Sequence, residues 1–185
     1  VYSGPTWVNE IALQEIGLDP KQVFKLMEKL QGHPLLCMVY GHAVKARIPN
    51  TDRTMKNFTE EPVHLITFDL DRYESPKYKR CGADITYNQI VDDANGFITN
   101  YLPPEFHNVS YILRFSSSFM LKEDGMLKAH ILFLSKEPQY PREIGLWMKQ
   151  IGVPADATFY LNLTQPVFTA APVVLDTIDP FQMRQ

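Results

Sequence analysis

The sequence has few cysteines, no long apolar run and no surplus of positive charge. Its 185 residues include two cysteines, too few for a disulfide scaffold or, on their own, for a four-ligand zinc site. No apolar run approaches the roughly 20 residues of a membrane-spanning helix, and no signal-peptide pattern opens the chain. The formal net charge of −3 argues against nucleic-acid binding through bulk charge alone. We therefore expect a cytoplasmic protein with no zinc and no membrane partner, in which any basic groove is local.

What remains is the composition of an ordinary globular domain. Hydrophobic residues make up 45% of the chain and charged residues 21%, which suits one domain with a sizeable core. The chain begins at Val1 rather than at a methionine. We interpret residues 1–185 as a single processed or excised domain of a longer protein.

Periodicity predicts helices and strands in alternation, and hence an α+β fold with a mixed, mainly antiparallel sheet. Helices are expected over Trp7–Leu18, over Lys21–Leu30 after the start signal Asp19-Pro20, after a cap at Asp84, and from Pro141 to Gly152. Strands are expected over Val63–Asp71, Val109–Phe115, Lys128–Leu134, Ala157–Leu163 and Val167–Val174. Leu35–Tyr40 is either a short strand or a buried turn, and His42–Pro62 is expected to be a long loop.

The first chemical signal is the end of the strand that reads VHLITFDLD. Side chains two apart share a face of a strand, so Asp69 and Asp71 point the same way and Leu70 points to the opposite layer. Neighbouring carboxylates repel each other unless a cation lies between them, and Mg²⁺ or Mn²⁺ prefers such oxygen ligands. A solvated acidic strand end explains the same pattern without a metal.

The second signal is Lys128-Ala129-His130 on a later strand. Lys128 and His130 share a face by the same rule. Arg114 and the serines of residues 116–118, among them Ser116 and Ser118, add hydrogen-bond donors suited to phosphate oxygens. A polar turn and an ordinary strand histidine are the alternatives.

The third signal is Asp156 in VPADATFY, which is either a turn or cap aspartate or a third metal ligand. Rival aspartates are Asp84, Asp92, Asp93, Asp176 and Asp179. Of these, Asp92 and Asp93 lie in a helical pattern and are expected to be solvated.

The order DLD, then SSS…KAH, then an aspartate followed by QPVFTAAP resembles the archaeo-eukaryotic primase superfamily, in particular the primase-polymerase domains of phage and plasmid replication proteins. The resemblance covers about residues 53–180, which would form an RRM-like primase palm, and leaves residues 1–50 as an N-terminal helical region. The chain departs from the family in having Lys128 where serine is common, and Ala155 is a weak apolar neighbour for Asp156.

The resemblance implies a DNA primase or DNA polymerase that makes or extends primers on single-stranded DNA from dNTP or NTP, with two Mg²⁺ or Mn²⁺ ions per site. It implies a helicase domain in the full-length protein as a further partner, and the host-cell cytoplasm as the location if a phage encodes the protein. The roles it implies are metal ligation by Asp69, Asp71 and Asp156, with His130 as a fourth catalytic residue; nucleotide binding by Arg114, Ser116, Ser118, Lys128 and His130; and template binding by Lys45, Arg47, Arg53, Lys56, Lys77, Lys79 and Arg80.

Two other functions fit parts of the sequence. A replication-initiator or single-stranded-DNA-binding module would use the basic loops and not the carboxylates. A haloacid-dehalogenase-type phosphatase also has a strand like ITFDLD, but that family expects Thr or Val where this chain has Tyr73.

Overall fold

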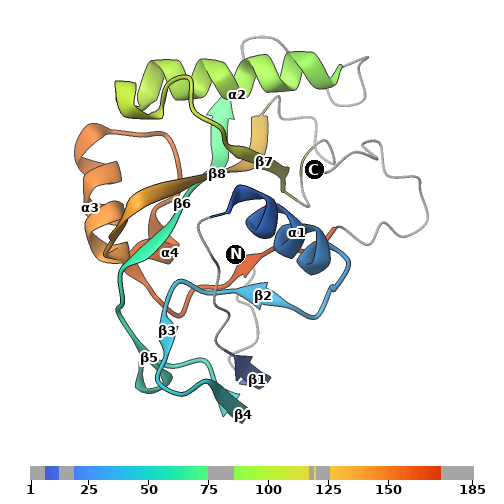
Figure 1. The fold of residues 1–185 in the computed structure, drawn as a ribbon, viewed down its shortest axis with the longest axis vertical. Coiled ribbons are helices and arrows are strands. Elements are labelled where there is room, and N and C mark those ends of the chain that lie inside the picture. The colour runs from blue at the N-terminus through green and yellow to red at the C-terminus, as the bar shows by residue number, and fades with distance from the viewer. Residues whose placement is uncertain (1–6, 13–18, 75–85, 117–118, 120–125, 172–185) are drawn as a thin grey trace.

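The computed structural model describes residues 7–12, 19–74, 86–116, 119 and 126–171. It is a mixed α+β fold with small antiparallel sheets (Figure 1). The helices are α1 (Pro20–Gln31), α2 (Tyr87–Tyr101), α3 (Pro141–Ile151) and α4 (Thr158–Leu161), with 3₁₀ turns η1 (Met55–Asn57) and η2 (Pro104–Phe106). The strands are β1 (Trp7–Ala12), β2 (Cys37–Met38), β3 (His42–Ala43), β4 (Arg47–Asp52), β5 (Phe58–Thr59), β6 (Val63–Glu74), β7 (Ile112–Phe115), β8 (Met126–Gln139) and β9 (Val167–Phe168).

The largest sheet has three antiparallel strands in the order β6-β8-β7. One face of this sheet is apolar. Phe68 and Leu70 of β6 and Ile131 of β8 lie on it and are fully buried in the main core. Helices α2 and α3 cover this face with Phe97 and Met148, among others. Burial of side chains of this size stabilises a fold by about 1.5–3 kcal/mol each, so this face holds the sheet and both helices together.

The opposite face of the same sheet is divided between an apolar part and a polar part. Helix α1 packs Val23 and Met27 onto Leu132 of β8, with Ile112 of β7 beside them. Asp19 begins the helix as predicted, because its carboxylate accepts a hydrogen bond from the Lys21 amide at 2.9 Å. Further along the strands no helix covers this face in the described part of the chain, and the side chains there are charged.

Residues 42–59 contain strands as well as turns, so the prediction of a long loop over His42–Pro62 was wrong. Strand β4 pairs with β1 and β3 pairs with β5, and these strands gather at the lower end of Figure 1. A small separate core of Ile11, Ala43 and Phe58 holds this β-rich end together.

The predicted helix Trp7–Leu18 is also wrong over its first half, and residues 13–18 lie outside the described residues. Trp7–Ala12 is β1, whose register with β4 runs from Trp7↔Asp52 to Ala12↔Arg47. The partner strand is supplied from far along the sequence, so local periodicity did not reveal it. Leu35–Tyr40, for which the sequence allows a short strand or a buried turn, contains the short strand β2.

Other elements confirm or adjust their predictions. Helix α3 begins at Pro141 as predicted and ends at Ile151, and its C-cap Gly152 is left-handed with φ 71°, which glycine adopts without strain. Helix α2 is capped by Thr86 with Gln89, while Asp84 lies outside the described residues. Thr158–Leu161 is the short helix α4, so the extended segment predicted over Ala157–Leu163 was wrong. Strands β6 and β8 run longer than predicted, and β7 starts three residues later than predicted.

Candidate functional site

A row of charged side chains crosses the polar face of the sheet. In register, Asp69 of β6 is opposite His130 of β8, and His130 is opposite Arg114 of β7. The neighbouring row on the same face is Thr67, Leu132 and Ile112, where α1 packs. Asp69, His130 and Arg114 thus form a row across three strands, next to the region of the sheet that α1 covers.

Asp69 and His130 are close and largely shielded from solvent. The Nε2 of His130 lies 3.2 Å from Oδ1 of Asp69, with side-chain exposures of 10% and 18%. Among the described residues, this buried Oδ1 accepts no well-aligned hydrogen bond. A buried carboxylate oxygen without a hydrogen-bond donor is costly unless a positive charge compensates it, so the position favours a nearby cation.

Asp71 lies on an irregular stretch of β6. Leu70 pairs with Ala129 and Tyr73 pairs with Leu127, so Asp71 and Arg72 together stand opposite Lys128. Such a β-bulge re-aims side chains and is frequent beside functional sites. Leu70 and Tyr73 both enter the main core, and Asp71 remains on the polar side with Asp69, as predicted.

The charges around Asp71 alter its ionisation. Partial burial raises the pKa of the Asp71 carboxyl, the negative charge of Asp69 and then of Asp156 raises it further, and His130 and Lys128 oppose the rise. The sequence-predicted carboxylates and cations therefore act on one another across space, although they come from three separate segments.

Lys128 and Ser116 extend the row toward the end of the sheet. Lys128 is buried on β8, with 8% of its surface exposed. The Ser116 amide donates a hydrogen bond to the Lys128 carbonyl at 2.9 Å, which continues the β7–β8 pairing by one step. Ser118, the other predicted phosphate contact, lies outside the described residues.

Arg114, at 3% exposed, is more deeply buried than the predicted phosphate-binding residues Lys128 and His130. Its guanidinium donates to the Phe168 carbonyl at 3.3 Å, and its Nε has no hydrogen-bond partner among the described residues. Burial lowers the pKa of Arg114 to about 10, so the group is still charged at neutral pH. A buried guanidinium with an unused donor provides a site for an anion.

Asp156 reaches Asp69 through the backbone. The Asp156 amide donates to the Asp69 carbonyl at 2.8 Å, and the two residues form an isolated antiparallel bridge on the free edge of β6. The Asp156 side chain is exposed and accepts hydrogen bonds from Thr158 at the start of α4. Asp156 therefore makes a local turn contact through one carboxylate oxygen, and Ala157 rather than Asp156 is the N-cap of α4. The backbone bridge to Asp69, which no sequence pattern predicted, fixes the position of the residue.

A buried hydroxyl network supports this edge of β6. The Thr67 amide donates to the Tyr160 hydroxyl at 2.6 Å, and the Tyr40 hydroxyl donates to Thr67 Oγ1 at 2.6 Å. Burial raises the pKa of Tyr40 to about 12 and that of Tyr160 well above its ordinary value. Sequence reasoning missed these residues, although Thr67 shares the face of Asp69 by the alternation rule. They fix the strand two residues before Asp69.

The site does not contain a formed metal cage. Among the residues that the structure describes, no three histidine, cysteine, aspartate or glutamate side chains are grouped so as to hold a metal ion. The carboxylates of Asp69, Asp71 and Asp156 are nevertheless within one another's electrostatic influence. They fit a divalent cation by donor chemistry and by the unpartnered Oδ1 of Asp69.

The four predicted template-binding cations that the structure describes are not gathered at this site. Arg47 is ion-paired with Glu10, and Lys56 with Asp52 at 2.8 Å. Arg53 donates to the Thr164 carbonyl, and Lys45 is exposed at the β-rich end. Lys77, Lys79 and Arg80 lie outside the described residues.

Two of the rival aspartates are described. Asp92 is exposed on α2, as predicted. Asp93 is 2% exposed, so its predicted solvated position was wrong, because it lies on the α2 face that packs onto the sheet. The remaining rivals, Asp84, Asp176 and Asp179, lie outside the described residues.

Comparison with known proteins found no match: no family model, no curated protein and no solved structure is similar to this chain at a significant level. In the described segments, no helix has the length and apolar character needed to cross a bilayer. The functional argument therefore rests on the residues and their geometry.

Proposed function

We propose that the protein is a template-dependent nucleotidyltransferase, a DNA primase or polymerase domain that makes or extends primers on single-stranded DNA from dNTP or NTP. The observation that carries the proposal is the row Asp69–His130–Arg114, with Asp156 bridged to Asp69 and Asp71 beside it. Acidic groups stand at one end of this row and buried donors at the other. Phosphoryl transfer needs both, because it depends on positioning and charge neutralisation.

The acidic end is suited to divalent ions. Asp69, Asp71 and Asp156 would hold two Mg²⁺ or Mn²⁺ ions, which when bound would activate the 3′-hydroxyl of the primer and stabilise the leaving pyrophosphate. His130 would keep the Asp69 carboxylate oriented through their 3.2 Å contact. The mutual repulsion that raises the pKa of Asp71 is the feature that a bound cation would relieve.

The basic end is suited to a triphosphate. Arg114, Lys128 and His130 are all at most 8% exposed, so their donors are held in place before a ligand arrives. Charge-assisted hydrogen bonds from a shielded guanidinium and ammonium are stronger than neutral ones. Ser116, next to Lys128, would add a hydroxyl, and Ser118 is proposed for the same role.

The finer fold assignment, an RRM-like primase palm, is part of this proposal. Its support is the antiparallel sheet β6-β8-β7 with helices on one face and a polar row on the other. The motif order along the chain, from Asp69 through His130 to Asp156, agrees with it. A helicase domain elsewhere in the full-length protein and a cytoplasmic location belong to the same proposal.

The test is incorporation of labelled dNTP or NTP on primed and unprimed single-stranded DNA with Mg²⁺ or Mn²⁺. We expect Asp69→Ala to lower incorporation by at least about 100-fold, the usual cost of removing a group that stabilises transition-state charge. Glu137→Gln, an exposed carboxylate on the far end of β8, is the matched control and should retain full activity.

Each alternative function predicts a different outcome of these assays. Equal incorporation by wild type and Asp69→Ala, or none with any metal, contradicts the proposal. Binding of single-stranded DNA that persists in Asp69→Ala without any synthesis would identify a non-catalytic DNA-binding module. Rapid p-nitrophenyl phosphate hydrolysis that is lost in Asp69→Asn would identify a phosphatase.

A further inference from the structure

Helix α1 carries positive charge although the whole chain is acidic. Lys21, Lys25 and Lys29 recur every four residues and stand on one side of the helix about 6 Å apart along its axis. Glu28 is the one acidic residue between Pro20 and Gln31. Neither Lys21 nor Lys25 has an ion-pair partner among the described residues, in contrast to Arg47 and Lys56 at the β-rich end.

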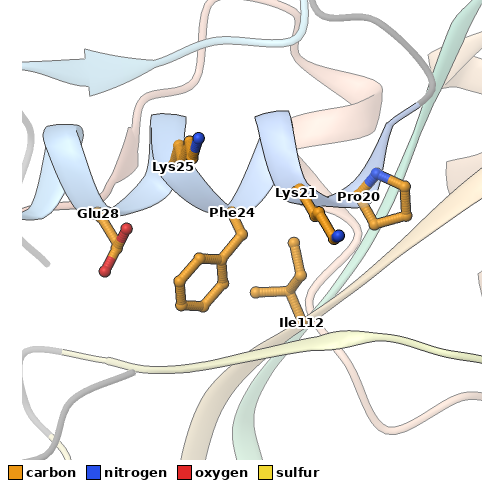
Figure 2. A pocket seen from close by; sticks show the side chains of 6 residues that line it. All are labelled: Pro20, Lys21, Phe24, Lys25, Glu28 and Ile112. Atoms are coloured by element: carbon orange, nitrogen blue, oxygen red, sulfur yellow. The ribbon is translucent and has the colours of Figure 1, made fainter.

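An aromatic ring lies beside these lysines. Phe24 is 39% exposed and, with Glu28 and Lys21, is directed toward β7, where Ile112 forms the floor (Figure 2). The hollow between helix and strand, which Pro20 and Lys25 also line, has a volume of about 420 Å³. That volume is within the range of small-molecule sites, about 300–1,000 Å³. An exposed phenyl ring over an aliphatic floor offers a stacking surface for a planar group.

The hollow and the charged row involve neighbouring positions of β7. Ile112 and Arg114 are two residues apart on β7 and share a face, so they are separated by roughly 7 Å. Through the register, Ile112 belongs to the row of Leu132, and Arg114 to the adjacent row of His130. A DNA strand bound in the hollow would therefore lie beside the part of β7 that carries Arg114.

We propose that the groove formed by Lys21, Phe24, Lys25 and Ile112 binds a segment of single-stranded DNA, with a base stacked on Phe24 and phosphates at the lysines. This inference deepens the proposed function and rests on it for the identity of the strand as template. The combination of an aromatic platform with cations is the usual solution for single strands, because every base has a π-face and every phosphate a charge. An acidic peptide would satisfy the lysines but has no planar group for Phe24.

Glu28 sets one boundary of the surface. Its carboxylate lies one turn beyond Phe24 and on the same side of the groove (Figure 2), where it repels phosphate. Removal of this charge should tighten the binding of DNA.

The experiment measures binding of a fluorescein-labelled oligothymidylate, about 16 nucleotides long to cover a full single-strand site, by fluorescence anisotropy in EDTA. Without metal ions the readout is independent of catalysis. We expect Phe24→Ala to raise the Kd by about 5-fold to 100-fold and Phe24→Trp to preserve it. Lys21→Gln and Lys25→Gln should each reduce the slope of log Kd against log salt by about 0.7, and Glu28→Gln should lower the Kd.

The matched controls are Tyr140→Ala and Lys149→Gln, an exposed aromatic and an exposed lysine at α3, which packs on the other face of the sheet. Both should bind like wild type, and circular dichroism should show that all variants are folded.

A Kd unchanged by Phe24→Ala overturns the inference even if nucleotide incorporation is intact. A wild type that binds a polyglutamate peptide and not the oligothymidylate overturns it in favour of an acidic protein partner. If the oligothymidylate binds as expected but Asp69→Ala incorporates as well as wild type, the groove stands and the proposed catalysis fails.

Discussion

The Nε2 of His130 lies 3.2 Å from the Oδ1 of Asp69, and the same two residues are direct partners in the β6–β8 register. The backbone pairing of the two strands therefore sets the positions of both residues, and the contact does not depend on the side chains alone. It joins the acidic half of the site to the basic half, because His130 is also the partner of Arg114 on β7.

Replacement of Asp71 should change how stability depends on pH. Because the folded state raises the pKa of Asp71, the unfolded state binds fewer protons there, and stability is lost as the pH rises from the unfolded pKa of about 3.9 through the folded value. Asp71→Asn should therefore have a higher Tm than wild type at pH 7, and the difference should vanish below about pH 3.9.

Thermal unfolding across this pH range checks the Asp71 prediction. Glu137→Gln is again the control, since Glu137 is an exposed carboxylate remote from this cluster. A Tm difference between Asp71→Asn and wild type that is the same at every pH would show that the carboxyl charge is not responsible. Addition of Mg²⁺ should raise the Tm of wild type more than that of Asp71→Asn.

Replacement of Arg114 should separate stability from ligand binding. Arg114 is 3% exposed and its Nε has no hydrogen-bond partner in the described part of the chain, so burial of its charge is a cost to folding. Arg114→Met keeps the aliphatic bulk, and we expect its Tm without ligand to equal or exceed that of wild type. The rise in Tm on addition of dNTP should be lost, because the donor for phosphate is gone.

Arg114→Lys is the companion variant for this measurement. It keeps the charge but not the planar fork of donors, so part of the nucleotide-induced shift should remain. A full shift in Arg114→Met would remove Arg114 from the nucleotide site.

Removal of single tyrosine hydroxyls should show how much each hydrogen bond at the edge of β6 contributes to the free energy of unfolding. Tyr160→Phe leaves the buried Thr67 amide without its 2.6 Å acceptor and should lower the free energy of unfolding by about 1–3 kcal/mol. Tyr40→Phe removes a donor to a hydroxyl that can rotate to other partners and should cost about 1 kcal/mol. Urea denaturation of both variants gives the ranking, and the reverse order would contradict it.

Two helical glycines should respond to alanine in opposite directions. At Gly145 of α3, an added Cβ would lie 2.9 Å from Tyr160 Cβ and 3.0 Å from Leu161 Cδ2. This overlap outweighs the helix propensity of alanine, and we expect Gly145→Ala to destabilise the protein by about 1–3 kcal/mol. At Gly96 of α2 the nearest atom is the Tyr73 hydroxyl at 3.8 Å, so Gly96→Ala should stabilise by about 0.5–1 kcal/mol.

The glycine pair is measured by the same urea titrations. A loss of stability in Gly96→Ala as large as in Gly145→Ala would show that packing between α3 and α4 is not the cause. Because α4 begins two residues after Asp156, Gly145→Ala should also reduce nucleotide incorporation, whereas Gly96→Ala should not.

The local sequence pattern was sufficient to predict several helices and strands and to identify the charged residues of the candidate site. The apolar run of β6, the start of α1 at Asp19 and the limits of α3 follow from residue types and spacing within a single segment. The alternation rule placed Asp69 and Asp71 on one face, and Lys128 and His130 likewise, because a strand repeats every two residues wherever it is.

Only the tertiary structure decided how these segments meet. The register that sets Asp69 opposite His130 and Arg114, the bulge at Asp71, and the bridge from Asp156 to Asp69 depend on strands from distant parts of the chain. The strand β1, the helix α4 and the burial of Asp93 differ from their predictions for the same reason. A segment's own periodicity reports its local geometry, whereas its partners depend on hydrophobic burial and backbone pairing summed over the whole fold.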